Sequence, residues 1–411
     1  MRRIRDDLTI AERVRHYRAR RGMSQEVLAG LVGRTEDWLS RVENNRIALD
    51  RLSVIRRLAN ALDVTTGALL GEPALLDWSA DSGTHTIPAL QGVLMDYRQV
   101  TPQLAAPSID NGEPPKLDLL RRDISEVFDA YQDSRYGYVT GRAPLVLSDA
   151  MHAARTAART EQGRVQGLLA LAYQCAVAVL TKLGETELAW IASERGLAAA
   201  QQADGPLILG SLFRSVTHAL HATGHFGAGV ELTKAAAGVL QPYLATRADD
   251  CLLSIYGSLF LTGAVAASRA EDRQATTTFL TEAQAVANRL GRDANFMWTA
   301  FGPTNVAIHR VSTAMELGDV QIALDLGPRV DTSGLPVERR VRHAIEIARA
   351  YSARNRRDEA LIELLNAEQL APEQVKYHAI SRQLVLSWIR NQRGPRNTRL
   401  DHLARRLNLL Q

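Results

Sequence analysis

The sequence predicts an all-α protein, in which a small N-terminal domain of five helices precedes a long array of helical hairpins. Three observations point to this fold class. Helix-favouring alanine, leucine, arginine, glutamate and glutamine run through all 411 residues, whereas strand-favouring alternation is weak. Short apolar repeats in the first 71 residues are separated by capping residues and glycines. Beyond residue 116, amphipathic stretches occur in pairs whose turns are 38 to 48 residues apart.

The first 71 residues predict five short helices. The first is expected over residues 10–21, because its apolar residues recur at i, i+4 and i+7 and Gly22 can end it. Later helices begin after residues that are good N-caps, namely Ser24, Thr35 and Thr65. Gly33 supplies the left-handed residue that a tight turn between the second and third helices needs. The second and fourth helices are expected over residues 25–32 and 51–62, and the fifth ends at Gly71.

The stretch over residues 25–44, QEVLAGLVGRTEDWLSRVEN, has a regular apolar pattern around the turn glycine Gly33. The apolar positions of this pattern are Leu28, Ala29, Val32, Leu39 and Val42. Together with its flanking residues, the pattern resembles the helix-turn-helix of the Cro and lambda-repressor-like family, also called the xenobiotic-response-element (XRE) family. The resemblance covers about 60 residues. It implies a five-helix lambda-repressor-like domain whose partner is double-stranded DNA.

The resemblance also implies which residues meet DNA. In this family the second helix of the motif lies in the major groove, and the first helix crosses the backbone. Gln25 would hydrogen-bond a phosphate. The residues expected to face the groove are Thr35, Glu36, Asp37, Ser40 and Arg41. Those expected to meet the sugar-phosphate chain just beyond it are Asn44, Asn45 and Arg46. Arg41 is the best candidate for base readout, because a guanidinium group can bind guanine O6 and N7 with two bonds.

Several residues of the motif leave two interpretations open. Glu36 and Asp37 could accept a bond from cytosine N4, or could only favour the positive end of the helix dipole. Trp38 could touch a thymine methyl group, although packing over the fourth helix is the preferred interpretation. The resemblance further implies a structural ion pair between Arg13 and Glu43.

The net charge of +4 lies entirely in the N-terminal segment. Residues 1–75 contain 14 arginines and 10 acidic residues, whereas the remaining residues contain 35 basic and 35 acidic groups. An excess of positive charge in this segment favours contact with a polyanion such as DNA. A small charge of this kind is also compatible with an ordinary solvated face.

The sequence divides into three parts, over residues 1–71, 72–115 and 116–411. The second part is a connector in which Pro88 opens a short helix over residues 89–97. Its end, TPQLAAPSIDNGEPP over residues 101–115, is rich in Pro, Ser, Asp and Gly and reads as a linker. We therefore expect the N-terminal domain to reorient relative to the third part.

The third part is predicted to be a tetratricopeptide-like α-solenoid. Turns within its helical pairs are expected near Gly184, Gly224, Ala270, Gly318, Arg356 and Gly394. The clearest unit starts at residue 358 and resembles the second helix of a tetratricopeptide repeat at Ala360, Leu364, Ala367 and Pro372. A last helix over residues 396–410 is expected to cap the stack.

Helical arrays of this type present a concave groove to a peptide or another protein. The layout of the chain resembles that of the bacterial peptide-pheromone-sensing regulators, and this architecture implies a homodimer that senses a peptide, small-molecule or protein effector. Candidate effector-binding residues in the third part are Trp298, Asn305, His309 and Arg310. The alternative is a buried Asn305–His309 pair that only supports helix packing.

Metal binding and catalysis find little support in the sequence. His218, His221 and His225 are spaced i, i+3 and i+7, but Gly224 is expected to break the helix before the third histidine. No phosphate-binding, zinc-protease or serine-hydrolase motif is present, so we expect neither an enzyme nor a cofactor. Cys175 and Cys251 form no CxxC pair and are read as reduced thiols.

The chain is expected to be cytoplasmic and to have no membrane partner. Its N-terminus lacks the apolar segment of a signal peptide, and the apolar stretch over residues 167–180 is too short to span a bilayer. The function predicted is a sequence-specific DNA-binding transcriptional regulator. The alternative is a protein-interaction adaptor whose N-terminal domain is not used for specific DNA binding.

Overall fold

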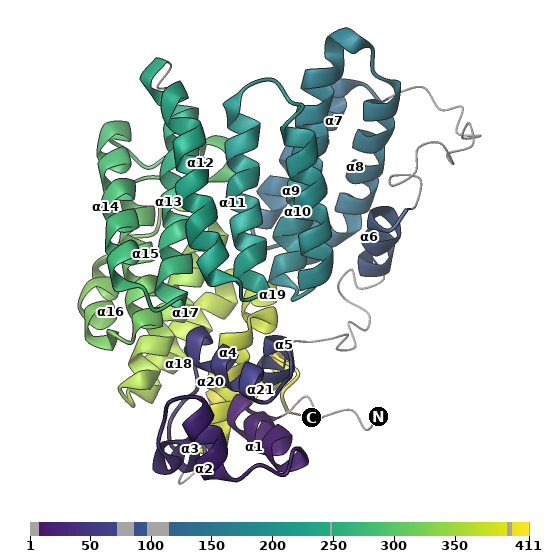
Figure 1. Cartoon of the computed structure of the whole chain (residues 1–411). Helices are drawn as coiled ribbons and strands as arrows, with labels where there is room; N and C mark the ends of the chain where they lie inside the picture. The colour runs from purple at the N-terminus through teal and green to yellow at the C-terminus, as the bar shows by residue number, and fades with distance from the viewer. Residues whose placement is uncertain (1–7, 72–85, 97–114, 247–248, 393–396, 411) are drawn as a thin grey trace. The chain divides into compact units, whose positions relative to one another are not determined.

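The computed structural model describes residues 8–71, 86–96, 115–246, 249–392 and 397–410 (Figure 1). Within these residues the regular structure is helical, and one isolated β-bridge joins Ala294 and Phe301. The predicted all-α fold class is confirmed. The residues group into two compact units. Unit 1 comprises the described parts of residues 1–76, 264–280 and 304–411, and unit 2 comprises those of residues 77–263 and 281–303.

The N-terminal domain, residues 8–71, contains the five predicted helices. They are α1 (Ile10–Arg20), α2 (Gln25–Leu31), α3 (Glu36–Glu43), α4 (Leu52–Ala61) and α5 (Thr66–Leu70). The three predicted N-caps accept hydrogen bonds from helix amides, at 3.1 Å for Ser24, 3.2 Å for Thr35 and 3.1 Å for Thr65. Gly33 has a φ of +68°, as the turn between α2 and α3 requires.

The start of α1 has a cap that the sequence analysis missed. The Thr9 hydroxyl accepts a bond from the Glu12 amide, and the Thr9 amide donates to the Glu12 carboxylate. This capping box satisfies two amides that the first turn of a helix would otherwise leave without partners.

The apolar pattern of the motif forms the core of the N-terminal domain. Its fully buried residues include Val14, Leu28, Leu39, Val42, Ile55 and Leu58. Removing apolar side chains of this size from water is the main favourable term in forming such a domain. Because Leu39 and Val42 point inward, the polar residues between them face away from the core.

The rest of the chain is built from helical hairpins. In chain order their helices are α7 (Leu117–Gln132), α8 (Tyr136–Thr156), α9 (Gln162–Lys182), α10 (Thr186–Ala200), α11 (Pro206–Ala222), α12 (Phe226–Thr246), α13 (Asp250–Arg269), α14 (Arg273–Leu290), α15 (Pro303–Leu317), α16 (Val320–Leu326), α17 (Val337–Ala353) and α18 (Arg357–Leu370). Short 3-10 helices, η3 (Arg159–Glu161), η4 (Phe296–Trp298) and η5 (Gly327–Arg329), lie between some of them.

Five of the six predicted turns fall between paired helices. They are the turns at Gly184, Gly224, Ala270, Gly318 and Arg356, whereas Gly394 lies outside the described residues. The hairpin of α7 and α8 was not predicted, because its turn contains no glycine. Ser134 adopts the positive φ of +61° in this turn instead.

The repeat unit recognised at residue 358 forms α18, the second helix of the hairpin of α17 and α18. Ala360, Leu364 and Ala367 are fully buried, and Pro372 starts the short helix α19 (Pro372–Tyr377). α20 (Ala379–Arg390) and α21 (Thr398–Arg406) follow. The last helix is shorter than the expected 396–410, because Asn397 caps it and its regular structure ends at Arg406. Leu403 and its neighbours join the same apolar cluster as α18.

The connector contains one described helix, α6 (Thr86–Leu94). It begins and ends earlier than the predicted 89–97, and Pro88 occupies its first turn, where a proline is tolerated. The predicted linker over residues 101–115 lies outside the described residues except for Pro115. The division of the sequence at residues 71 and 115 stays a prediction.

Two helical segments are long and apolar enough to cross a membrane by length and composition alone, within the described residues. They are Arg159–Lys182 and Asp250–Arg269, and 72% and 83% of their apolar windows are buried inside the structure. The first includes the apolar stretch that the sequence analysis judged too short, because the helix continues beyond it at both ends. Burial of this extent is typical of core helices.

Candidate nucleic-acid interface

α3 presents a polar face to solvent. The residues of the predicted DNA-contacting set that are exposed are Thr35, Glu36, Asp37, Arg41, Asn44 and Arg46. The half-buried members of the set are Gln25, Ser40 and Asn45. Leu39 and Val42 are fully buried on the opposite side of the helix, so the orientation of this polar face is fixed by the core. Four of the predicted residues, Gln25, Glu36, Ser40 and Asn44, also line one depression.

A shallow depression joins this face to α1 and α2. Its lining residues are Arg15, Arg18, Gln25, Glu36, Ser40, Glu43 and Asn44. Arg15 and Arg18 were not among the predicted contact residues. Their i, i+3 spacing places them on one side of α1, which is the signal that could have found them.

Glu43 connects two of the residues that line this depression. Its buried carboxylate accepts bonds from the Arg18 guanidinium at 2.5 and 2.8 Å and from the Gln25 amide nitrogen at 2.7 Å. The hydrogen bond with Glu43 raises the pKa of Arg18 above its usual value. The Gln25 amide nitrogen has a second N–H, so one donor remains for a phosphate.

The expected ion pair between Arg13 and Glu43 is not formed, and a different arginine takes the place of Arg13. Arg18 pairs with Glu43, whereas Arg13 Nε donates to the Leu8 carbonyl at 3.3 Å. The two arginines are five positions apart, and five helical steps rotate a side chain to a different face of α1. Glu43 still ties the end of α3 to α1, as the interpretation required.

The two acidic residues at the start of α3 are exposed, and one of them contacts a residue of the same helix. The Asp37 carboxylate lies 4.0 Å from the Arg41 guanidinium one turn later. Trp38 is half-buried and packs against the core of the N-terminal domain, as the preferred interpretation predicts. The Arg34 guanidinium lies 5.6 Å from the centre of its ring.

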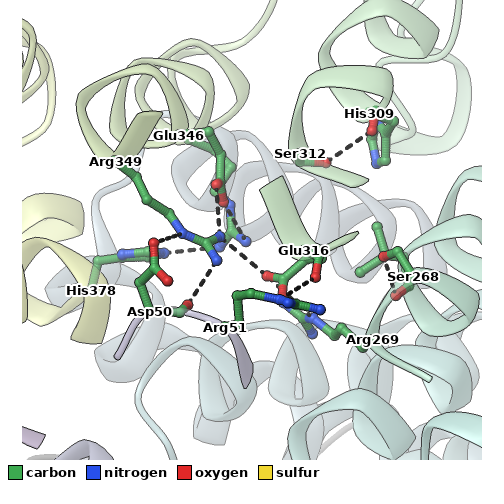
Figure 2. A network of polar contacts seen from close by, with 12 residues as sticks. Asp50, Arg51, Ser268, Arg269, His309, Ser312, Glu316, Glu346, Arg349 and His378 are labelled. Carbon is green, nitrogen blue, oxygen red and sulfur yellow. Dashed lines mark hydrogen bonds and ion pairs between the residues drawn. The ribbon is translucent and has the colours of Figure 1, made fainter. Parts of the chain in front are cut away.

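The loop that follows α3 is bound to the hairpin repeats of unit 1 by a buried arginine. The Arg349 side chain is 1% exposed and donates to the Asp50 carboxylate at 3.1 Å and to the Asp50 carbonyl at 2.7 Å. The same guanidinium contacts Glu346 at 3.1 Å and Glu316 at 3.3 Å (Figure 2). Burial by itself would lower the pKa of Arg349, but the three carboxylates outweigh it and raise the pKa. Arg349 therefore stays charged in the interior.

A second cluster holds α4 to the turn between α13 and α14. The Glu271 carboxylate accepts bonds from Arg51 at 3.2 Å, Ser53 at 3.0 Å and Arg57 at 3.2 Å. Arg51 also donates to the Glu316 carbonyl at 2.9 Å, and Figure 2 shows both side chains beside the Arg349 cluster. The two clusters, Asp50–Arg349 and Arg51–Glu271, are called the anchor below.

α20 supplies a third set of contacts with the N-terminal domain. Gln383 accepts a bond from the Ile10 amide at 2.8 Å, and Arg390 contacts Glu12 at 3.0 Å. Asn391 donates to the Asn45 carbonyl at 3.1 Å. Nothing in the sequence indicated these contacts, because the linker pattern suggested a loosely attached domain.

Residues 9–72 match a family model described as a helix-turn-helix domain. The N-terminal domain is a helix-turn-helix domain. The match agrees with the geometry above, in which α2 and α3 form the two helices of the motif around Gly33.

No curated protein matches this chain. A crystal structure of BtubC (BKLC) from P. vanneervenii is 15% identical, with 61% of this chain and 90% of that chain covered and a TM-score of 0.37. A crystal structure of Bacillus thuringiensis PlcR in complex with the peptide PapR7 and DNA is 12% identical, with coverage of 88% and 98% and a TM-score of 0.35.

The candidate effector residues occupy two different units. In unit 2, Trp298 stacks on Phe128 with ring centres 4.2 Å apart, and its indole donates to Asp129 at 3.0 Å. In unit 1, Asn305 is buried and Arg310 is exposed on α15. Trp298 thus takes part in contacts inside its own unit.

His309 is half-buried on the same helix. Its Nδ1 lies 2.8 Å from the Asn305 carbonyl. Loss of hydration, with the positive charge of Arg339 nearby, lowers the pKa of His309 to about 3. The ring therefore stays neutral at neutral pH, as the packing alternative for Asn305 and His309 requires.

The three histidines of unit 2 are not arranged as one ligand set. The His218 and His221 rings have centres 5.7 Å apart, whereas His225 lies beyond Gly224 and contacts the Thr223 hydroxyl at 3.0 Å. Among the described residues, no group of three or more His, Cys, Asp or Glu side chains could hold a metal ion.

Proposed function

We propose that the protein is a sequence-specific DNA-binding transcriptional regulator. The observation that carries this proposal is the polar face of α3, which is exposed and held in a fixed orientation by Leu39 and Val42 in a helix-turn-helix domain. A helix of this type fits the major groove of B-DNA. The Arg41 side chain, which lies on α3 and is 53% exposed, would hydrogen-bond a guanine base.

The residues around α3 would position it on the phosphate backbone. Gln25 would donate to a phosphate from the start of α2, with its amide oriented by Glu43. Asn44, Asn45 and Arg46 would meet the backbone at the other end of α3. Contacts of this type fix the register of the domain on the duplex, whereas Arg41 supplies sequence preference.

A homodimer is part of the proposal. One α3 helix of eight residues reads only a few base pairs, and regulators of this type gain specificity by binding two half-sites about one helical turn apart. A two-fold-symmetric binding sequence is therefore expected. A monomeric mass by light scattering at micromolar concentration would contradict this part.

The proposal also includes an effector that the protein senses. The hairpin repeats would bind a peptide, small molecule or protein, and Trp298, Asn305, His309 and Arg310 stay the candidate contacts. Arg310 is the member whose exposure favours contact with a ligand most directly.

The proposal is tested by mixing the purified chain with fragmented DNA from its own source and sequencing the bound fragments at two salt concentrations. Enrichment of a symmetric sequence that survives the higher salt is the expected result, because base contacts persist when phosphate contacts weaken. The experiment is repeated with an extract of the source organism added, in case an effector is needed. Unselective binding that disappears at the higher salt in both experiments would favour the adaptor alternative.

A further inference from the structure

One positively charged side chain of the hairpin repeats, Arg357, is connected to the end of α3 through Asn391. The anchor and α20 fix this arrangement within unit 1. The Asn391 amide donates to the Asn45 carbonyl at 3.1 Å, and the Arg357 guanidinium donates to the Asn391 carbonyl at 3.0 Å. Two hydrogen bonds therefore connect the end of the recognition helix to the turn between α17 and α18.

This turn carries three exposed arginines, Arg354, Arg356 and Arg357. Arg356 is neutralised by Glu359 at 2.9 Å and lies over the Tyr351 ring. The bonds of Arg354 and Arg357 go to neutral oxygens instead, on Gln321 at 3.5 Å and on Asn391. Neither of these two guanidinium groups pairs with a carboxylate among the described residues, although Asp358 is exposed close by.

We propose that Arg354 and Arg357 extend the DNA-binding surface from the helix-turn-helix domain onto the repeats. This inference rests on the proposed function. Arg46, exposed at the end of α3, would bind one phosphate, and Arg357 and Arg354 would bind the next phosphates of the same strand. Successive phosphates follow each other every ~3.4 Å of helix axis along one strand, so adjacent arginines can reach several of them.

The partner class is the phosphate backbone of duplex DNA outside the half-site read by α3. Exposed arginines that bind phosphate need no particular base, so the contact adds affinity without sequence preference. The repeats thereby act as a second DNA-contacting element, in addition to any effector groove.

The test compares the variant R354Q/R357Q with R329Q, in which another exposed arginine, on η5, is neutralised. Binding to a duplex that extends about ten base pairs beyond the half-site is measured as a function of salt. The double variant should bind roughly three- to tenfold more weakly at 0.1 M salt, with the slope of log K against log salt reduced by about one for each arginine. R329Q should bind like the wild type.

Two controls keep the outcome specific. Arg357 also bonds Asn391, so the single variant R354Q, which loses only a long bond to Gln321, must show part of the same effect. On a duplex that ends at the half-site, wild type and variants should bind equally.

Each other result overturns the inference. Unchanged or tighter binding by R354Q/R357Q means that the turn does not touch DNA or obstructs it. A loss that persists on the short duplex means that the effect does not come from flanking phosphates. If the wild-type chain binds no duplex DNA at any salt concentration, the proposed function fails together with the inference.

Discussion

The two sides of the helix-turn-helix domain differ in how they are built. The side that we propose to face DNA, called the DNA-facing side below, is made by α3, whose residues are neighbours in sequence and mostly exposed. The repeat-facing side is made by the anchor, in which Asp50 meets Arg349, a residue 299 positions later, and the Arg349, Glu316 and Glu346 side chains are buried. An exposed polar face costs little to fold and is available to a ligand. A buried ionic cluster is costly unless every charge has a partner, so it is expected to be sensitive to single changes.

The largest effect is expected from breaking the anchor. Arg349→Met leaves the carboxylates of Asp50, Glu316 and Glu346 without their shared cation in the interior. Loss of one partner of a buried ion pair costs about 3–5 kcal/mol. Urea denaturation should show this loss, whereas Arg329→Met on the surface should change the free energy of unfolding by less than about 0.5 kcal/mol. A cost below about 1 kcal/mol for Arg349→Met would mean that the cluster is not a structural element.

A second prediction concerns His309, which lies on the repeat side of unit 1. Its folded-state pKa of about 3 is below the usual 6.5, so the unfolded chain binds the proton more tightly. Its contribution to stability is therefore complete above pH 6.5 and decreases as the pH falls toward 3, by up to about 1.4 kcal/mol per pH unit.

Replacement by a side chain that does not titrate tests this directly. His309→Gln should unfold with a weaker pH dependence between pH 6.5 and 4.5 than the wild type. The His402→Gln variant changes an exposed histidine of α21 and serves as the control. Identical pH profiles for wild type and His309→Gln would show that His309 titrates normally in the folded chain.

A smaller effect is expected at the start of α2. Ser24→Ala removes the hydroxyl that accepts the Val27 amide, and loss of such a cap costs about 1 kcal/mol. Ser24→Asp, which retains an acceptor, should recover most of this loss. Equal destabilisation by both variants in thermal or urea unfolding would contradict the capping role.

Much of the DNA-facing side could be predicted from sequence, because it is determined by local patterns. The N-caps Ser24 and Thr35, the turn at Gly33 and the apolar positions of the motif specify α2 and α3 without information from distant residues. The expected pairing of Arg13 with Glu43 was wrong, because the arginine that meets Glu43 depends on how α1 is rotated in the folded domain. Propensity and spacing do not determine that rotation closely enough.

The anchor could not be predicted from sequence. Asp50, Arg51 and Glu271 are ordinary surface residues by type, and only the folded chain brings them next to Arg349 and Glu316. The hairpins of the repeats were predictable where a glycine marks the turn. The hairpin of α7 and α8 was missed, because Ser134 takes that conformation without one.

Arg41 on α3 is the residue that we propose to read DNA sequence. The most direct test measures the affinity of wild type, Arg41→Ala and the control Arg329→Ala for the selected duplex and for duplexes with single base-pair substitutions. Wild type and control should discriminate against loss of one G·C pair by about 1–3 kcal/mol, and Arg41→Ala should lose that discrimination at this position alone. Wild-type affinity and discrimination in a folded Arg41→Ala variant would contradict the claim.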